Sequence, residues 1–344
     1  MASLSTHASH CVRFLHALSS QMLEADSVRM IIAFYCLSSL DVLDQLDAKS
    51  KKADRDQWRE WIWAQQISSS WGTGFRSGPS VAIPASNVSP NPGQYDVPHV
   101  LMTFSAILSL AILRDDLKRL DRAGLRTFLC RMQRPDGSFT AIPNSIESDL
   151  RMVYAVFVIC SLLNEWDAIN VQKALEFIHN CRTYEGGYGQ RPYLEAQGGT
   201  TFCALGSLAL CPSAPELSAN DRSRTLRWLC GRQIGGFQGR TEKGQDACYS
   251  FWCGGSLKIL GAEQFVNVKA NVEFLRECQF KFGGIAKAPG DHPDPMHTYL
   301  SLAALSIYPF SDEMRSLKGV DVAVNATQET AAWARQHLSS TSPN

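Results

Sequence analysis

Apolar residues along this chain recur with a helical period, in pairs of segments that differ in how far round the helix the apolar surface extends. The first segment of each pair carries charges, such as Lys173, Glu176 and Arg227, whereas the second is apolar on nearly every face. A helix that is apolar all round is buried, and a charged face indicates an outer helix. No stretch alternates as a strand would, so the chain is predicted to be all-α. The first segments are 125–133, 171–181, 225–233 and 272–279, and the second are 150–163, 200–211, 247–260 and 296–308.

A short turn separates the two segments of each pair, and it recurs at a fixed distance along the chain. Its apolar residues are Phe139, Tyr188, Phe237 and Ile285, at spacings of 49, 49 and 48 residues. Such self-similarity is typical of repeat architectures, and repeated outer and inner helices can close into an α/α toroid with a central cavity. We therefore predict one domain over 1–344, with repeats at roughly 120–167, 168–216, 217–264 and 265–312.

Two regions fall outside the regular repeats. Gly72-Thr-Gly-Phe75 resembles an earlier copy of the turn, and an insertion rich in Pro, Ser and Asn follows it at residues 77–97. The polar end of the chain, residues 338–344, is predicted to be a disordered tail.

Composition narrows the class of protein. Lys and Arg total 33 and Asp and Glu total 33, and this balance argues against nucleic-acid binding or a membrane-surface role. The longest apolar run, residues 152–160, is far shorter than the roughly 20 residues that cross a bilayer. The first residues lack the pattern of a secretory signal, and the 11 cysteines, an odd number, sit mostly within helical patterns. These features predict a cytoplasmic protein with reduced, largely buried thiols.

The repeat register predicts a site at one rim of the toroid. Counting 11 or 12 residues from each turn residue reaches the start of an inner helix, at Arg151, Thr200, Cys248 and His297. Helix N-termini carry partial positive charge and unpaired amide donors, which suit an anionic ligand.

Asp246, Cys248 and His297 are the candidate metal ligands of this rim. Together they offer oxygen, sulfur and nitrogen, and three ligands with an open position are what a catalytic zinc site requires. Asp294 and Pro295 are typical of an N-cap and a first helical position, which would place His297 in the first turn. The alternative is structural: an N-cap Asp beside a buried Cys, and a helix-start His with satisfied hydrogen bonds. The shared register in adjacent repeats favours the metal site.

Three cations precede the same two inner helices, and two aromatic residues follow. Arg240, Lys243 and Lys287 could clamp a diphosphate, or they could be solvated loop residues. Tyr249 and Trp252 lie three apart on one helical face, where they could line the cavity or pack in the core. An aromatic wall suited to an isoprenoid chain is predicted from Phe34, Tyr154, Phe202 and Trp252.

Two rivals with a similar architecture are disfavoured. A terpene cyclase would need an acidic cluster such as Asp-x-Asp-Asp, and the sequence contains none. A complement-type thioester domain would need Gly-Cys-Gly-Glu-Gln, whereas Gly261-Ala-Glu-Gln264 lacks the cysteine.

The combined motifs resemble those of the β subunits of protein prenyltransferases. They are Asp246-x-Cys-Tyr-Ser-Phe-Trp252, Gly283-Gly, and Pro293-Asp-Pro-Met-His-Thr-Tyr299, and the resemblance runs from His10-Cys-Val-Arg-Phe14 to about Tyr308. It implies one zinc ion per β subunit, bound by Asp246, Cys248 and His297.

The resemblance also implies roles for residues around the zinc. Tyr249, like Arg240 and Lys243, matches a diphosphate contact, and Trp252 matches an isoprenoid wall. Gln197-Gly198-Gly199 stands where the family usually has His before the Gly pair, so this chain has a neutral amide in place of a cation. His99 and Arg151 match positions that contact the acceptor peptide.

Two positions resemble the type I geranylgeranyl members in particular. Lys287 stands where farnesyl and Rab-type members carry an Asp, which in the farnesyl enzyme helps to hold magnesium on the diphosphate. A Lys there implies that magnesium is not required. Ile31 stands where farnesyl enzymes carry a bulky Trp that shortens the lipid pocket. The farnesyltransferase and Rab-type β subunits remain the alternatives.

The function implied is that of a catalytic β subunit of protein geranylgeranyltransferase type I. Geranylgeranyl diphosphate would be the donor, and the acceptor would be the cysteine of a C-terminal CaaX motif with X = Leu, as in Rho-type small GTPases. The acceptor cysteine would react as a thiolate held by zinc, with Tyr249 and Lys287 stabilising the leaving diphosphate. The resemblance implies an obligate heterodimer with a prenyltransferase α subunit.

Overall fold

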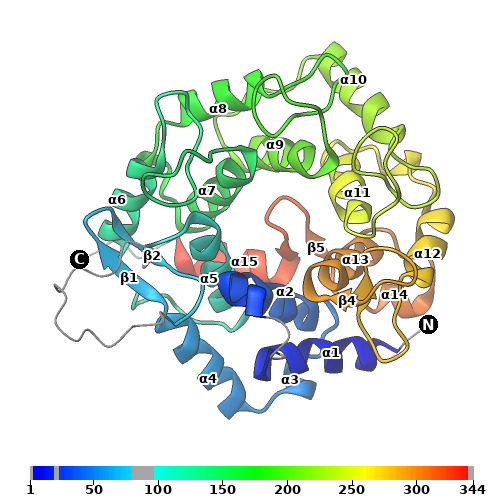
Figure 1. The fold of residues 1–344 in the computed structure, drawn as a ribbon, viewed down its shortest axis with the longest axis horizontal. Helices are drawn as coiled ribbons and strands as arrows, with labels where there is room; N and C mark the ends of the chain where they lie inside the picture. Colours follow the sequence, from blue (N-terminus) through cyan, green and yellow to red (C-terminus); the bar gives the residue numbers. More distant parts are fainter. Residues whose placement is uncertain (1–2, 19–22, 80–96, 340–344) are drawn as a thin grey trace.

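Residues 3–18, 23–79 and 97–339 are described by the structure, a computed structural model. An inner ring of helices surrounds a central space, and each inner helix contacts the next until the last contacts the first (Figure 1). The predicted α/α toroid is therefore confirmed, closure included. The inner helices are α2 (Arg29–Val42), α5 (Val100–Ile112), α7 (Leu150–Leu163), α9 (Gly198–Leu210), α11 (Tyr249–Ile259) and α13 (Pro295–Ile307).

An outer layer of helices covers the inner ring (Figure 1). In α8, for example, Leu175 and Ile178 are buried while Lys173 and Glu176 are exposed, as the charged face predicted. The sequence placed the starts of α6, α10 and α12 three to six residues too late, and the largest difference is in α10, which was expected from Thr225. That helix begins at Ala219 because the Ser218 side chain caps it by accepting a hydrogen bond from the Asp221 amide. The outer helices are α1 (Leu4–His16), α4 (Lys52–Trp63), α6 (Arg122–Met132), α8 (Val171–Asn180), α10 (Ala219–Cys230) and α12 (Val268–Glu277).

The recurring turns pack each hairpin against the next outer helix. Gly186 has φ of +108°, and a Cβ there would lie 2.6 Å from the carbonyl carbon of Arg224 in α10. Gly283 has φ of +92°, and a Cβ there would lie 2.2 Å from the carbonyl oxygen of Thr6 in α1. Glycine is therefore required at both turns, and the last turn closes the ring onto the first helix.

The same turns are bonded to the inner helices that follow them. The Tyr188 amide donates to the Thr201 hydroxyl at 3.0 Å, and the Ile285 amide donates to the Thr298 hydroxyl at 2.9 Å. The turn residues Phe139, Tyr188, Phe237 and Ile285 are all buried. Each repeat thus fixes the start of its inner helix, which is where the site residues lie.

Short antiparallel strand pairs accompany the helices, although the sequence indicated no strands. β1 (Gln66–Ser69) pairs with β2 (Gly72–Phe75), β3 (Ile285–Ala286) with β4 (Pro293–Asp294), and β5 (Val320–Asp321) with β6 (Ala326–Thr327). Strands of two to four residues are too short for an alternating pattern to be visible in the sequence. The remaining elements are η1 (Leu23–Val28), α3 (Leu46–Lys49), η2 (Trp166–Ala168), η3 (Glu263–Phe265), α14 (Asp312–Arg315) and α15 (Gln328–Leu338).

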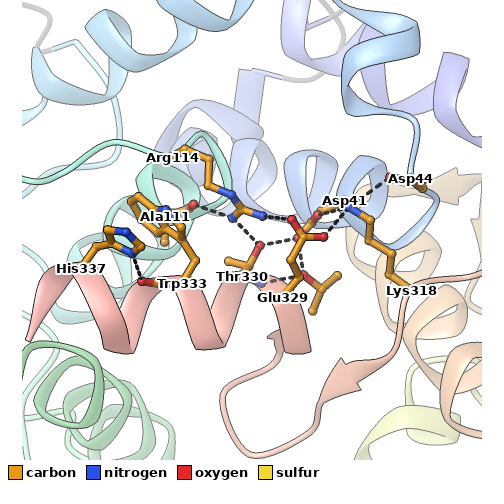
Figure 2. A network of polar contacts seen from close by, with 10 residues as sticks. Asp41, Asp44, Ala111, Arg114, Lys318, Glu329, Thr330, Trp333 and His337 are labelled. Carbon is orange, nitrogen blue, oxygen red and sulfur yellow. Dashed lines mark hydrogen bonds and ion pairs between the residues drawn. The ribbon is translucent and has the colours of Figure 1, made fainter.

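A polar network attaches the C-terminal segment to one end of the ring (Figure 2). Asp41, near the end of α2, accepts hydrogen bonds from the hydroxyls of Thr327 and Thr330, each at 2.7 Å. Lys318 lies 2.9 Å from Glu329 and 3.6 Å from Asp41. These contacts hold the β5–β6 hairpin and α15 across the end of the ring at which α2 terminates.

Some predicted features fall at or beyond the limits of the described residues. Leu338, where the predicted tail begins, ends α15 and is fully buried, while residues 340–344 lie outside the described residues. Most of the 77–97 insertion, residues 80–96, also lies outside them. Among the described residues no helix is long and apolar enough to span a membrane.

Candidate metal centre and cavity

A cavity of about 520 Å³ lies within the inner ring and brings most of the predicted site together. The predicted rim residues Arg151, Thr200, Cys248 and His297 all line it, which confirms the register argument. Further predicted residues in the lining are Gln197, Gly199, Asp246, Tyr249, Trp252 and Lys287. Lining residues that sequence reasoning did not name as site residues are Tyr35, Leu101, Phe104, Gln190, Cys203, Met296 and Asn325.

The candidate metal ligands converge at the starts of two neighbouring inner helices. The ligand atoms of Asp246, Cys248 and His297 all lie within 4.8 Å of one another. Asp246 and Cys248 belong to a turn just before α11, in which the Cys248 amide donates to Asp246 Oδ1 at 3.0 Å. The Ala247 amide donates to the Lys287 carbonyl at 2.9 Å and so joins this turn to the next repeat. The turn directs the carboxylate and thiol to one side, which two positions inside a helix could not do.

A second carboxylate orients the histidine. Nδ1 of His297 lies 2.5 Å from Asp294 Oδ2, and the His297 amide donates to Asp294 Oδ1 at 3.0 Å. The other ring nitrogen, Nε2, lies 3.2 Å from Asp246 Oδ1 but has no hydrogen-bond partner among the described residues. A buried ring nitrogen left open beside a thiol and a carboxylate fits a metal ligand whose second nitrogen is held by a carboxylate. The sequence predicted Asp294 only as a helix cap.

The electrostatics of the trio also favour a bound cation. Burial alone would lower the pKa of His297, but the carboxylates of Asp246 and Asp294 outweigh it and raise the pKa to about 9. Burial, and then the Asp246 charge, raises the pKa of the Cys248 thiol well above its ordinary value. A divalent cation supplies the charge that stabilises a thiolate and a neutral imidazole. These residues could therefore hold one metal ion, and a mixed O, S, N set suits zinc.

The predicted diphosphate residues fall into two groups. Tyr249 and Lys287 line the cavity, and Tyr249 can approach because a Cβ at Gly239 would lie 2.1 Å from its ring. The exposed Lys287 side chain has no acidic partner within the described part of the chain. Arg240 and Lys243 lie outside the lining, where Arg240 is 3.2 Å from Glu195 and Lys243 is exposed. Both belong to the exposed loop that precedes Asp246.

The Gln197-Gly198-Gly199 segment opens α9 at the cavity. Gln197 is the N-cap, but its side chain makes no capping hydrogen bond. Gly198 is buried outside the lining, and a Cβ there would lie 2.6 Å from the sulfur of Cys253. Gly199 lines the cavity, and a Cβ there would meet nothing within 4 Å. Gly198 is thus needed for close packing, whereas Gln197 and Gly199 face the ligand space.

The two predicted peptide-binding residues differ in position. Arg151 lines the cavity, and its guanidinium is held by Asp149 at 2.6 Å and by Glu147 at 2.7 Å. His99 is the N-cap of α5, and its Nδ1 accepts a hydrogen bond from the Leu101 amide at 3.1 Å. Burial lowers the pKa of His99 to about 4, so its ring is neutral. His99 lies outside the cavity lining, whereas Leu101, two residues further along the chain, belongs to it.

The aromatic wall is only partly the predicted one. Tyr154 and Trp252 line the cavity, together with Tyr35 and Phe104. Phe34 and Phe202 were predicted in the wall, but both are fully buried outside the lining. They pack behind it, with ring centroids 5.5 Å apart for Phe34 and Phe104 and 4.9 Å apart for Phe202 and Trp252. They support the wall rather than forming its surface.

Ile31 is half-buried and also lies outside the lining. It is one turn before Tyr35 on the same face of α2, so a larger side chain at Ile31 would extend along the wall that Tyr35 begins.

Comparisons with known proteins show the family to which the chain belongs. The prenyltransferase alpha-alpha toroid domain family matches residues 3–326. The chain is 33% identical over 295 residues to the geranylgeranyl transferase type-1 subunit beta of Arabidopsis thaliana, covering 81% of this chain and 78% of that protein. It is 34% identical over 310 residues to the Dictyostelium discoideum protein of the same name, covering 86% and 87%. The solved structure of Candida albicans protein geranylgeranyltransferase-I complexed with GGPP matches with a TM-score of 0.84 and 27% identity, over 97% of this chain and 98% of that one.

Proposed function

Because the chain belongs to the prenyltransferase family with the α-α toroid fold, we propose that it is the catalytic β subunit of a type I protein geranylgeranyltransferase. One observation carries this proposal. An oxygen, a sulfur and an unpartnered imidazole nitrogen converge at the mouth of a cavity walled by aromatic rings. That juxtaposition suits the joining of a thiol to an isoprenoid chain.

Asp246, Cys248 and His297 would hold one zinc ion, and Asp294 would keep the His297 ring turned toward it. Zinc, when bound there, supplies a positive charge that keeps the acceptor's cysteine ionised near neutral pH, whereas a free thiol has a pKa of about 8.5. The rest of the cavity binds and orients the donor. Tyr35, Tyr154 and Trp252 would contact the geranylgeranyl chain and exclude water from it.

The reaction forms one bond and breaks one. The acceptor sulfur, having released its proton to solvent, bonds to the first carbon of the geranylgeranyl group. The bond from that carbon to the diphosphate oxygen breaks, and diphosphate leaves with the electron pair. Lys287 and the Tyr249 hydroxyl would stabilise the charge that builds on the leaving group, and Lys287 would make magnesium unnecessary. Removing one such donor typically lowers a rate about 10²–10³-fold.

The acceptor and its compartment follow from the same proposal. The acceptor is a protein that ends in CaaX with X = Leu, such as a Rho-type small GTPase, and Arg151 would approach its C-terminal end. All 11 cysteines of the chain are free thiols, which supports a reducing compartment such as the cytoplasm.

The site is completed by an α subunit in this proposal. Of the nine large apolar side chains that are exposed among the described residues, six lie on the loops that lead into the inner helices. They are Ile146, Tyr184, Tyr193, Leu194, Ile234 and Phe282. These loops all precede the starts of inner helices, and several exposed apolar side chains at one end of a molecule suit a surface that binds another protein. We propose that the α subunit covers this face and closes the mouth of the cavity over the acceptor peptide.

The test is prenyl transfer by the chain co-expressed with a prenyltransferase α subunit. Peptides ending in CaaX with Leu or Ser are each offered geranylgeranyl and farnesyl diphosphate, with zinc present and magnesium supplied or chelated. Geranylgeranyl transfer to the Leu peptide without magnesium is expected. Farnesyl transfer, or a strict need for magnesium, would instead identify a farnesyl or Rab-type member.

A further inference from the structure

The turn between β5 and β6 reaches the central cavity from the end of the ring opposite the metal trio. Figure 1 shows this turn projecting toward the middle of the ring, just before α15. Its last residue, Asn325, lines the same cavity as Cys248 and His297. The turn is therefore placed to act as the floor of the cavity.

Two tyrosines of the inner ring hold the turn in place. The Tyr154 hydroxyl, from α7, donates to the Ala323 carbonyl at 2.8 Å, and the Tyr299 hydroxyl, from α13, donates to the Asn325 carbonyl at 2.9 Å. The Asn325 amide also donates to the Asp321 carbonyl at 2.9 Å. A turn anchored to two separate inner helices is a rigid boundary rather than a loose loop.

The side chain of Asn325 has no structural partner for its oxygen. The residue is 2% exposed, and Oδ1 makes no hydrogen bond among the described residues. Its backbone has φ of +61°, which asparagine and glycine tolerate best. Glycine would satisfy this backbone without burying an unpartnered amide oxygen, which is unfavourable. The fold does not account for the side chain, so its role concerns what fills the cavity.

We propose that residues 322–325 form the floor of the lipid cavity and that the Asn325 side chain limits the length of isoprenoid chain the cavity accepts. This inference rests on the proposed function for the identity of the ligand. A chain that ends against Asn325 fits, whereas a longer chain would have to displace a turn anchored by Tyr154 and Tyr299. Selection by length would then depend on this floor as well as on the side wall near Ile31.

Equilibrium binding of isoprenoid diphosphates to the complex with the α subunit tests the floor directly. The ligands are farnesyl, geranylgeranyl and geranylfarnesyl diphosphate, with 15, 20 and 25 carbons. Asn325→Gly keeps the backbone conformation and deepens the cavity, so affinity for the 25-carbon ligand relative to the 20-carbon ligand should rise about tenfold. Asn325→His fills the floor with a residue that also tolerates positive φ, so the ratio of 15-carbon to 20-carbon affinity should rise by a similar factor.

Asn164→Gly is the matched control, since Asn164 has φ of +55° but is an exposed cap of α7. Unchanged length ratios in whichever Asn325 variants fold, as judged by thermal melting, would overturn the inference. If the Asn325 substitutions shift the binding ratios but the complex without substitutions transfers no prenyl group, the floor is supported and the proposed function is contradicted. If the complex transfers the 20-carbon group but the Asn325 substitutions leave the binding ratios unchanged, the proposed function is supported and the floor is contradicted.

Discussion

The Asp41 network and the candidate metal trio lie at opposite ends of the toroid and differ in whether their buried polar groups have hydrogen-bond partners. The closed end is the one at which α2 terminates and the β5–β6 hairpin lies. There Asp41 accepts hydrogen bonds from two threonine hydroxyls, and Lys318 contacts Asp41 and Glu329 (Figure 2). At the open end, Nε2 of His297 has no hydrogen-bond partner within the described residues. A polar network whose members satisfy one another stabilises the fold, whereas a buried nitrogen without a partner beside a thiol and a carboxylate is suited to bind a ligand. The comparison predicts that substitutions in the metal trio remove function and that substitutions in the Asp41 network remove stability.

Cys248→Ala should have the largest effect, because it removes one of the three candidate metal ligands. We expect loss of stoichiometric zinc and a fall in transfer rate of roughly 10³-fold, while the melting temperature without metal changes little. Metal analysis and single-turnover kinetics measure the two effects. Cys253→Ala, which lies within α11 and outside the cavity lining, is the control. Full zinc content and full rate in Cys248→Ala would refute the metal assignment.

Asp41→Ala should have the opposite effect to Cys248→Ala, because it should lower stability and leave zinc binding unchanged. The carboxylate is 4% exposed, and its loss leaves Thr327, Thr330 and Lys318 without a shared acceptor. Breaking a buried charged network typically costs about 3–5 kcal/mol, and because Lys318 is partly exposed we expect about 3 kcal/mol from the free energy of unfolding. Urea denaturation measures the loss, with Asp44→Asn as the control, because Asp44 is an exposed contact of the same lysine and asparagine tolerates its φ of +53°. Zinc content per folded molecule should stay unchanged, and its loss would contradict the division between the two ends.

Asp294→Asn should weaken metal binding without abolishing it. The substitution removes the carboxylate that orients His297, and loss of such a supporting group typically lowers metal affinity 10–100-fold. Competition with a zinc chelator measures the change in affinity. Asp291→Asn alters an exposed carboxylate in the same loop and should leave the affinity as it is. Equal affinities for the two variants would show that Asp294 acts only as a helix cap.

The seam where α1 closes the ring should give a smaller, pH-dependent effect. Burial lowers the pKa of His10 from 6.5 to about 4, and that of His7 likewise to about 4. Between these pH values the unfolded chain binds protons that the folded chain does not. The free energy of unfolding should therefore fall as pH drops from about 6.5 to about 4, by about 1.4 kcal/mol per pH unit for each histidine.

Denaturation at several pH values measures how steeply the free energy of unfolding changes with pH. This dependence should be shallower in His10→Gln but unchanged in His179→Gln, on the exposed face of α8. A slope that His10→Gln leaves intact would mean that acid acts elsewhere in the molecule.

The convergence of the candidate metal ligands could be predicted because the repeat carries positional information. Cys248 and His297 stand at equivalent places in adjacent repeats, so the period alone predicted that they meet. The role of Asp294 was missed, since an Asp three residues before a helical residue is also an ordinary cap. The spacing of three residues between Asp294 and His297 was the signal that could have indicated their contact. The aromatic wall was predicted less well, because a helix apolar all round does not indicate which face meets the cavity, and Phe34 and Phe202 proved to lie behind it.

The sequence by itself determined the all-α class, the repeat and the rim on which the candidate metal ligands lie, because helical period and turn spacing are local properties of the chain. Tertiary structure alone decided the rest. Closure depends on Gly283 meeting α1, and the floor depends on Tyr154 and Tyr299 reaching the β5–β6 turn. These contacts join residues that are distant along the chain. The packing of the whole ring, rather than any local pattern, determines which of them form.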